Sequence, residues 1–128
     1  MKVLLTGYAG LLGRHLARAL KQKGFSIRVL LHQSTVTRKD FAEEVDEVIW
    51  GSIDDPEVVR IALKEVQLVV HSSWAFSSPG EKRPTINETG TELLIKESVQ
   101  AGVKAFSFIS SIAVYGMKSI EKKLTDSE

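Results

Sequence analysis

Three glycines near the start of the 128-residue chain have a spacing that suits the binding of a phosphate group. Gly7, Gly10 and Gly13 lie three residues apart, between a short apolar run and a segment with helical periodicity. Phosphates bind main-chain N–H groups at the N-terminus of a helix, where unpaired donors and the helix dipole favour negative charge. Glycine is also the default turn residue, so a merely structural turn is the alternative interpretation. We predict a dinucleotide-binding turn, because these glycines follow a predicted strand and begin a predicted helix.

Each of the three glycines has a separate expected task in such a turn. Gly7 would let the chain turn off the strand, Gly10 would leave room for the phosphates, and Gly13 would let the helix lie close to the strand. The predicted cofactor-binding turn consists of Gly7, Tyr8, Ala9, Gly10, Leu11, Leu12 and Gly13.

The elements around this turn are predicted from hydrophobic periodicity. Residues 3–6 form a short apolar strand, and apolar residues then recur at helical spacing. Basic residues lie on the opposite face of the predicted helix, and Gly24 is placed to end it. The apolar positions are Leu12, Leu16, Ala19 and Leu20, and the basic ones are Arg14, Arg18 and Lys21.

The rest of the chain repeats this alternation of strand and helix. We predict strands at 27–31, 45–50, 68–71 and 106–110, and helices at 56–64 and 84–101. Parallel strands need long connections, and right-handed crossovers place the helices on the faces of the sheet. The expected fold class is therefore α/β, with a doubly wound parallel sheet that is incomplete at its C-terminal edge. Segment 77–84 is a predicted loop, and segment 35–44 is either a loop or a single helical turn.

The same pattern predicts which side chains pack in the core. The strand at 106–110 is expected to be covered on both faces, because it is apolar nearly throughout. Trp50 is expected in the core at the end of a strand, whereas Trp74 suits either the core or a substrate pocket. The apolar positions of the helix at 84–101 that are expected to face the sheet are Ile86, Leu93, Leu94 and Val99.

The composition is that of an ordinary globular domain, and it excludes several classes of function. Lysine and arginine number 17 against 16 acidic residues, so a net charge of +1 gives no general attraction to nucleic acid or membrane. The absence of cysteine excludes disulfides, thiolate metal sites and a cysteine nucleophile. His15, His32 and His71 lack the spacing of a helical metal site, so no metal is expected. The apolar start is too short for a signal peptide, which predicts a cytoplasmic location.

Five segments of the chain resemble, in order, the motifs of one enzyme family. Residues 6–13 read Thr-Gly-Tyr-Ala-Gly-Leu-Leu-Gly, with one residue more than the G-x-G-x-x-G pattern. This segment resembles the glycine motif of the extended short-chain dehydrogenase/reductase family, which includes nucleotide-sugar epimerases and dehydratases. Four later segments are similar to that family's stretch after the third strand at 51–55, its fourth strand at 68–71, its N-x-x-G-T helix at 87–91 and its S-S-x-x-V-Y-G stretch at 110–116.

The resemblance implies that residues 1–128 are the N-terminal, cofactor-binding portion of a Rossmann-like, NAD(P)-dependent epimerase, dehydratase or reductase. The substrate would be a nucleotide-sugar-like molecule or another hydroxyl or carbonyl compound. A catalytic role is implied for Ser111, since the family's serine at this place helps to polarise the substrate oxygen. Further cofactor contacts are implied near the adenine at Ser52 and Ile53, and after the fourth strand at His71, Ser72 and Ser73.

The family's acid/base motif, Tyr-x-x-x-Lys, does not occur among these 128 residues. In the family, the lysine lowers the pKa of the tyrosine, which exchanges a proton while nicotinamide takes or gives hydride. Tyr115 does not supply the motif, because Ser119 stands four residues later and the segment matches a structural tyrosine of the family. We expect the motif and the substrate-binding part to follow Glu128. A non-catalytic dinucleotide-binding or regulatory module is the alternative.

The choice between NAD and NADP depends on the residues that follow the second strand. An acid about 20 residues after the glycines is expected to bind the ribose 2′-hydroxyl group of NAD. The candidates at that place are His32 and Gln33, and neither is a carboxylate. Basic residues near enough in sequence to contact a 2′-phosphate are Arg28, His32, Arg38 and Lys39. The sequence therefore leans slightly towards NADP, with His32 as the cofactor-binding candidate or an ordinary solvated histidine.

The fifth predicted strand would be left as an apolar edge with unpaired backbone groups. We expect this edge to find a partner, through self-association, pairing with another chain or continuation into a longer protein. The other expected partners are the dinucleotide and, in a full-length enzyme, a small-molecule substrate.

Overall fold

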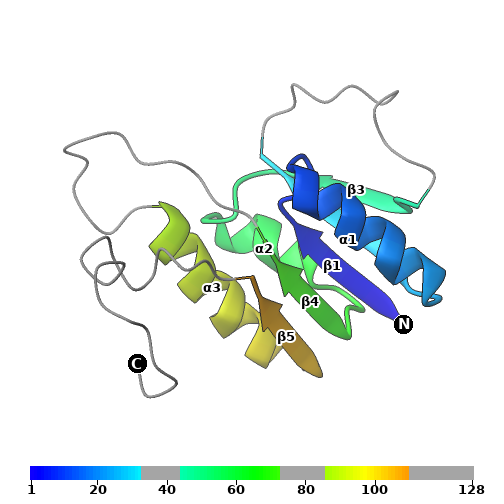
Figure 1. Cartoon of the computed structure of the whole chain (residues 1–128). Helices are drawn as coiled ribbons and strands as arrows, with labels where there is room; N and C mark the ends of the chain where they lie inside the picture. Colours follow the sequence, from blue (N-terminus) through cyan, green and yellow to red (C-terminus); the bar gives the residue numbers. More distant parts are fainter. Residues whose placement is uncertain (33–43, 73–85, 110–128) are drawn as a thin grey trace, which may run out of the picture.

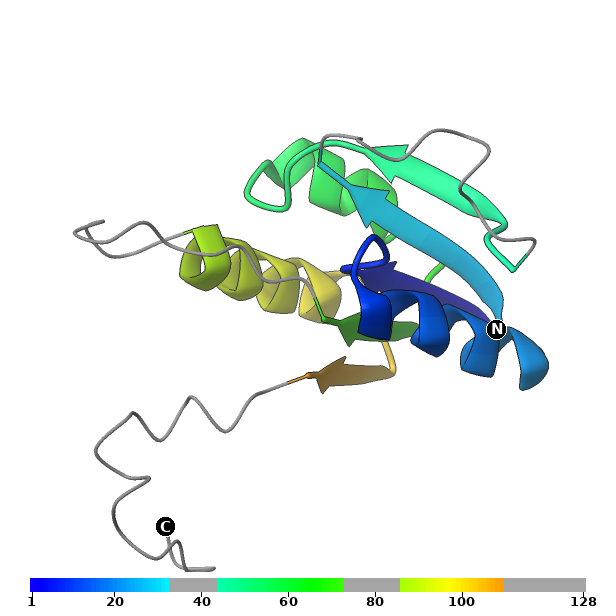
Figure 2. The same cartoon turned by 45° about the horizontal axis from the view of Figure 1, so that its top comes forward.

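The computed structural model describes residues 1–32, 44–72 and 86–109, which form a five-stranded parallel sheet with the strand order β3-β2-β1-β4-β5. Helix α1 covers one face of the sheet, and α2 and α3 cover the other (Figures 1 and 2). The doubly wound α/β fold predicted from the sequence is thus confirmed. In chain order the elements are β1 (Lys2–Thr6), α1 (Leu11–Gln22), β2 (Ser26–Leu31), β3 (Glu47–Trp50), α2 (Pro56–Ala62), β4 (Leu68–His71), α3 (Ile86–Gln100) and β5 (Ala105–Phe108).

The register of the sheet places the carboxyl ends of its central strands side by side. β1 pairs in parallel with β2 on one side and with β4 on the other. Thr6, the last residue of β1, lies opposite both Leu30 and His71. The strand order reverses between β1 and β4, and ligands of open α/β sheets bind in the crevice at such a switch point. The turn after β1 therefore lies where this fold offers a ligand site.

The core consists of two clusters, one on each face of the sheet. β1 supplies Val3 and Leu5 to the α1 side, where Ala17 is buried, and Leu4 to the opposite side. That opposite side contains Leu94 of α3. Because β1 is covered on both faces, it is a continuous apolar run rather than an alternating one.

Helix α3 packs on the core with Leu93 and Leu94 as predicted, but not with Val99. The side chain of Ile86 lies outside the described residues. Leu94 is fully buried, but Val99 is 75% exposed, so its predicted position against the sheet was wrong. Five residues correspond to about 140° around a helix, which turns Val99 away from the face that carries Leu94. The residues buried one turn after Leu94 are Glu97 and Ser98, and the Glu97 carboxylate lies 3.1 Å from Nε of Arg60 on α2. The ion pair allows the acidic residue to lie between the two helices.

The two edge strands are more exposed than the sequence predicted. Trp50 ends β3 and is 48% exposed, so its predicted place in the core was wrong. The residues of β5 are half-buried or exposed, so this strand is not covered on both faces as expected. Both strands lie at a margin of the sheet, where the described part of the chain supplies one neighbouring strand only.

Helix α1 keeps its predicted basic face but differs in its apolar face. The three basic residues named above are all exposed, and Leu16 and Leu20 pack against the core. Leu12 and Ala19 are exposed, and the buried line of the helix instead runs through the small residues Gly13 and Ala17.

None of the helices in the three described ranges is long and apolar enough to cross a membrane. The predicted loop at 77–84 and nearly all of segment 35–44 lie outside these ranges.

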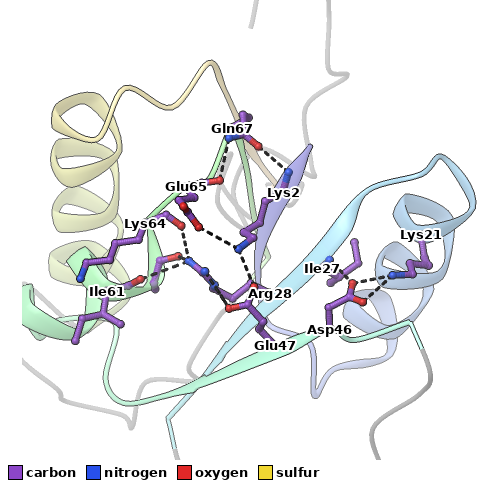
Figure 3. A network of polar contacts seen from close by, with 11 residues as sticks. Lys2, Lys21, Ile27, Arg28, Asp46, Glu47, Ile61, Lys64, Glu65 and Gln67 are labelled. Atoms are coloured by element: carbon purple, nitrogen blue, oxygen red, sulfur yellow. Dashed lines mark hydrogen bonds and ion pairs between the residues drawn. The ribbon is translucent and has the colours of Figure 1, made fainter.

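A buried arginine ties the end of α2 to the amino end of the sheet (Figure 3). Arg28 of β2 is 5% exposed, and its Nη1 atom donates hydrogen bonds to the carbonyl oxygens of Ala62 at 2.8 Å and Lys64 at 2.7 Å. Its Nη2 atom lies 3.0 Å from the carboxylate of Glu47. Hydrogen bonds from Lys2 and then Arg28 lower the pKa of the Glu47 carboxyl group, against the opposite effect of burial. The guanidinium thus satisfies carbonyl groups at the C-terminal end of α2 that the helix itself leaves unpaired.

Replacing this arginine should destabilise the fold. Arg28→Met leaves buried carbonyl groups without a donor, and we expect the free energy of unfolding in urea at neutral pH to fall by about 2 to 4 kcal/mol. Arg18→Met is the matched control, because Arg18 forms an exposed pair with Glu44 and should cost less than about 1 kcal/mol. Equal losses in the two variants would contradict a structural role for the buried guanidinium.

Candidate dinucleotide-binding site

Two of the three glycines in the turn after β1 are required by close packing. Gly7 has a φ of +77°, and a Cβ atom there would lie 2.7 Å from the main-chain carbonyl carbon and oxygen of Ser72. A Cβ atom on Gly13 would overlap the Gly7 carbonyl oxygen and lie 2.7 Å from Cα of Tyr8. Gly7 thus lets the chain turn off β1 beside β4, and Gly13 lets α1 lie directly against that turn.

Gly10 differs from these two glycines, because the position of its missing side chain is open space rather than packed protein. A Cβ atom on Gly10 would meet only the Gly7 carbonyl oxygen, at the ordinary distance of 3.5 Å. Gly10 is also the N-cap of α1, no side chain caps this helix end, and its first turn contains no acidic residue. The first amides of a helix have no acceptor within the helix, so this end combines open space with hydrogen-bond donors. An anion such as a phosphate group fits this arrangement.

Hydrogen bonds between β1 and the chain after β4 hold the glycine turn in place. The amide of Ser72 donates to Oγ1 of Thr6 at 3.1 Å, and Oγ of Ser72 donates to the carbonyl oxygen of Thr6 at 2.6 Å. Thr6 directly precedes Gly7, whose Cα in turn faces Ser72. The structure therefore brings together the predicted turn and one of the residues predicted to border the cofactor.

His71 lies beneath this turn as a buried, neutral imidazole. Its Nδ1 atom is 2.6 Å from Oγ1 of Thr6, and its Nε2 atom is 2.8 Å from Oγ1 of Thr91 on α3. The rings of Phe106 and Phe108 pack beside it, with centroids 6.3 Å and 5.4 Å away. The residue is 2% exposed, and burial lowers its pKa from 6.5 to about 4. His71 therefore acts within the protein framework rather than as an exposed ligand contact.

The other side chains of the predicted turn lie in different environments. The ring of Tyr8 is fully buried in the cluster on the α1 side, with the guanidinium carbon of Arg14 6.0 Å from its centroid. Tyr8 therefore has only its main chain to offer to a ligand. Ala9 and Leu12 are exposed at the front of α1, and the side chain of Leu11 lies outside the described residues.

The predicted adenine-side residues lie between β3 and α2. Oγ of Ser52 donates a hydrogen bond to Asp54, and the side chain of Asp55 caps α2 by accepting from the Glu57 amide at 3.0 Å. Ile53 packs against the core cluster on the α2 and α3 side. A Cβ atom on Gly90 of α3 would lie 2.5 Å from Cγ2 of Ile53, so the glycine allows this contact.

The residues that the sequence suggested for a 2′-phosphate do not lie together, because His32 follows the carboxyl end of β2 and the Arg28 guanidinium lies towards the amino end of the sheet. His32 is exposed at the end of β2, where such a group would be expected. Arg28 is excluded, because its guanidinium is buried at the amino end of the sheet and bound to Glu47 and α2. Gln33, Arg38 and Lys39 lie outside the described residues. The same holds for other residues discussed in the sequence analysis, namely Ser73, Trp74, Ser111 and Tyr115.

The sequence did not indicate two of the residues that organise the site. Thr6 is the last residue of an apolar strand, and its hydroxyl group contacts both Ser72 and His71. Thr91 lies within the N-x-x-G-T segment, which carried the family resemblance without predicting the contact with His71. A threonine among apolar strand residues and a histidine at the end of a buried strand were the available signals, because buried polar groups need partners.

Comparison with known proteins identifies the family. The model for the NAD dependent epimerase/dehydratase family matches residues 3–128. The chain therefore belongs to the NAD-dependent epimerase/dehydratase family, and the resemblance drawn from its motifs is confirmed.

Individual relatives agree with this assignment. UDP-glucose 4-epimerase from Erwinia amylovora is 28% identical over 130 residues, which cover 91% of this chain and 38% of that protein. The enzyme WbmG from Bordetella bronchiseptica in complex with NAD is 29% identical, with a TM-score of 0.76 over 91% of this chain and 39% of that one. A short-chain dehydrogenase/reductase superfamily protein from Agrobacterium tumefaciens with bound NAD is 30% identical, with a TM-score of 0.72 over 91% of this chain and 34% of that one. The chain thus spans about a third of the length of these proteins.

The neutral state of His71 makes the stability of the fold depend on pH. The folded residue titrates near 4 and the unfolded one near 6.5, so the unfolded chain alone takes up a proton between these values. The contribution of the neutral His71 to the stability of the fold is fully present above pH 6.5 and is lost as the pH falls towards 4, because protonation favours the unfolded chain. We expect the free energy of unfolding in urea to lose about 2 kcal/mol through His71 between pH 7 and pH 5.

Two histidine variants isolate this contribution. His71→Asn should remove the pH dependence in this window, whereas His15→Asn, at an exposed position of α1, should retain it. If wild type and His71→Asn showed the same dependence on pH, the imidazole would not be buried in its neutral form.

Proposed function

We propose that the front of α1 binds the pyrophosphate of a nicotinamide dinucleotide. The open space at Gly10, in front of a helix end without a side-chain cap, is the observation that carries this proposal. Gly7 and Gly13 support it, because their lack of a side chain brings the helix end into the crevice between β1 and β4. The related structures from Bordetella bronchiseptica and Agrobacterium tumefaciens contain bound NAD, which supports a nicotinamide dinucleotide as the ligand of this site.

We further propose that residues 1–128 are the cofactor-binding portion of an NAD(P)-dependent epimerase, dehydratase or reductase. Its substrate would be a nucleotide-sugar-like molecule or another compound with a hydroxyl or carbonyl group. A bound nicotinamide would supply hydride transfer, and the protein would contribute binding, orientation and electrostatic stabilisation. The family membership and the likeness to a UDP-glucose 4-epimerase support this reaction class. The cytoplasmic location expected from the sequence stays a prediction.

The proposed roles of the remaining residues follow the path of a dinucleotide across the carboxyl edge of the sheet. Ser52 and Ile53 would lie near the adenine, and His32 near its ribose. Ser72 and Ser73 would border the nicotinamide side of the cofactor. Ser111 would polarise the oxygen of the substrate. The exposure of His32 and the half-burial of Ser52 and Ile53 at the carboxyl ends of β2 and β3 are consistent with such contacts.

We infer a slight preference for NADP over NAD. The exposed residue that follows β2 is His32 rather than a carboxylate, so a 2′-hydroxyl group lacks its usual acidic partner. The buried position of Arg28 removes one of the cations that had favoured a 2′-phosphate. The preference therefore depends on His32 and on the basic residues at 38 and 39.

A substitution at Gly10 tests the phosphate site. Gly10→Val places a branched side chain in the space proposed for the phosphates, and we expect the affinity for both NADPH and NADH to fall more than about tenfold. Isothermal titration calorimetry measures this loss, and comparison of the two cofactors in the wild type tests the preference for NADPH. Tighter binding of NADH would reverse the inferred preference.

Two further variants separate lost binding from lost structure. Gly10→Ala adds one atom at an ordinary contact distance, so it should fold normally and show a smaller loss of affinity. Ala19→Val introduces a branched residue at an exposed position of the same helix, and its affinity should equal that of the wild type. Unchanged affinity in a folded Gly10→Val variant would refute the proposed site.

We also propose that the free edge of β5 pairs with further polypeptide, either a second copy, another chain or a continuation of this one. Within the described residues β5 pairs with β4 alone, and Phe108 and Ile109 are exposed beside this edge. An apolar strand with unpaired backbone groups is a template for additional strand pairing.

The edge proposal predicts concentration-dependent association of the 128-residue chain. Light scattering should show a mass that increases with concentration, and Phe108→Lys should shift association to higher concentrations because a charged edge disfavours strand pairing. Lys104→Gln, just before β5, is the control, because it introduces no charge at the edge. A monodisperse monomer at high concentration would contradict the proposal.

A further inference from the structure

The ring of His71 connects the glycine turn to helix α3. On one side, Nδ1 contacts the hydroxyl of Thr6 at 2.6 Å, immediately before Gly7. On the other side, Nε2 contacts the hydroxyl of Thr91 at 2.8 Å, in the second turn of α3. A neutral imidazole suits this position, because one of its nitrogens donates a hydrogen bond and the other accepts one. The rigid ring thereby fixes the separation of the two threonine hydroxyl groups.

At the Thr6 end, this connection helps to hold the phosphate-binding turn in its conformation. Oγ1 of Thr6 also accepts from the Ser72 amide at 3.1 Å, and Ser72 lies against Gly7 so closely that no Cβ atom fits there. A displacement of the ring would therefore move Thr6, Ser72 and Gly7 together. The turn has little freedom to adjust, because Gly13 packs directly on Gly7.

The Thr91 end is linked to the adenine side of the site. Gly90 precedes Thr91 and lies against Ile53, with the position of a Cβ atom 2.5 Å from Cγ2 of that side chain. Two consecutive residues of α3 thus contact the proposed adenine-side residue and, through His71, the proposed pyrophosphate turn. A shift of α3 would change the placement of these two parts relative to each other.

We propose that His71 is a positioning residue, which with Thr91 sets the placement of the pyrophosphate turn relative to the adenine side of the site. This inference rests on the proposed binding of a dinucleotide. A ligand that spans both parts must match their separation, so loss of the His71–Thr91 contact weakens its binding while the fold persists. Among the described residues, the ring contacts the uncharged side chains of Thr6, Thr91, Phe106 and Phe108. The proposed effect therefore depends on the separation of the two parts of the site rather than on a change in charge.

The substitution Thr91→Val tests this role, because it keeps the shape of the side chain and removes the hydroxyl group. We expect NADPH affinity, measured by calorimetry, to fall about fivefold to tenfold. The amide NMR signals of Gly7 and Ser72 should also shift in the absence of cofactor. Thr91→Ser restores a hydroxyl group and should restore both readouts. Glu92→Gln, at the neighbouring exposed position of α3, should change neither.

Substitutions of the histidine provide a second test if Thr91→Val does not fold. The amide of asparagine corresponds in position to Nδ1, so His71→Asn keeps the contact with Thr6 and is too short to reach Thr91. We expect it to reproduce the loss of affinity. The amide of glutamine corresponds to Nε2, so His71→Gln should retain the contact with Thr91 and should shift the Gly7 and Ser72 signals.

Two outcomes would overturn the proposal. One is a folded Thr91→Val variant with wild-type affinity for NADPH and unshifted signals of Gly7 and Ser72. The other is a loss of affinity that Thr91→Ser does not restore. If the wild type binds neither NADPH nor NADH, the proposed function fails instead. In that case the signals of Gly7 and Ser72 decide the positioning role alone, since a shift caused by Thr91→Val supports it and the absence of a shift refutes it.

Discussion

The site depends on one close contact, the packing of the first turn of α1 directly on the chain that leaves β1. Gly13 permits this contact, because any larger residue would overlap the Gly7 carbonyl group. The helix end is thereby held in the crevice between β1 and β4, with the ring of Tyr8 buried behind it and open space beside Gly10 in front. The amides that a helix leaves unpaired at its start are thus presented at the switch point of the sheet, where anions and ligands bind.

The two ends of the sheet are stabilised in different ways, and this difference favours an anion at one of them. At the amino end, charged side chains form a network in which Arg28 and Lys2 contact Glu47 (Figure 3). At the carboxyl ends of β1 and β4, the contacts among Thr6, His71 and Ser72 are between neutral groups, with Thr6 and His71 as the central pair. Burial keeps His71 uncharged at neutral pH, and the first turn of α1 carries no acidic residue. A phosphate at this end therefore meets helix amides without a nearby carboxylate in that turn to repel it.

The sequence was sufficient to predict the fold and the glycine turn, because both depend on local patterns. Apolar runs and helical periodicity predicted every described element to within a few residues, and the spacing of Gly7, Gly10 and Gly13 predicted the close packing of α1. The burial of side chains on the edge strands was predicted less well, because the sequence does not show which strands lie at the edges of the sheet. Trp50 is exposed because β3 is an edge strand. The role of Arg28 could not be predicted, because its carbonyl partners Ala62 and Lys64, at and just after the end of α2, are more than 30 residues away in the sequence. The hydroxyl contacts of His71 likewise depend on tertiary structure alone.

NMR titration of the isotope-labelled chain with NADPH measures whether the amides at the front of α1 hold the diphosphate. We expect the amide signals of Gly10, Leu12 and Gly13 to move in proportion to bound cofactor, while those of Gln22 and Lys23 at the far end of the helix stay in place. Inorganic pyrophosphate should move the same three signals at higher concentration. If NADPH bound while the signals at the front of α1 stayed unchanged, these amides would not be the site of the diphosphate.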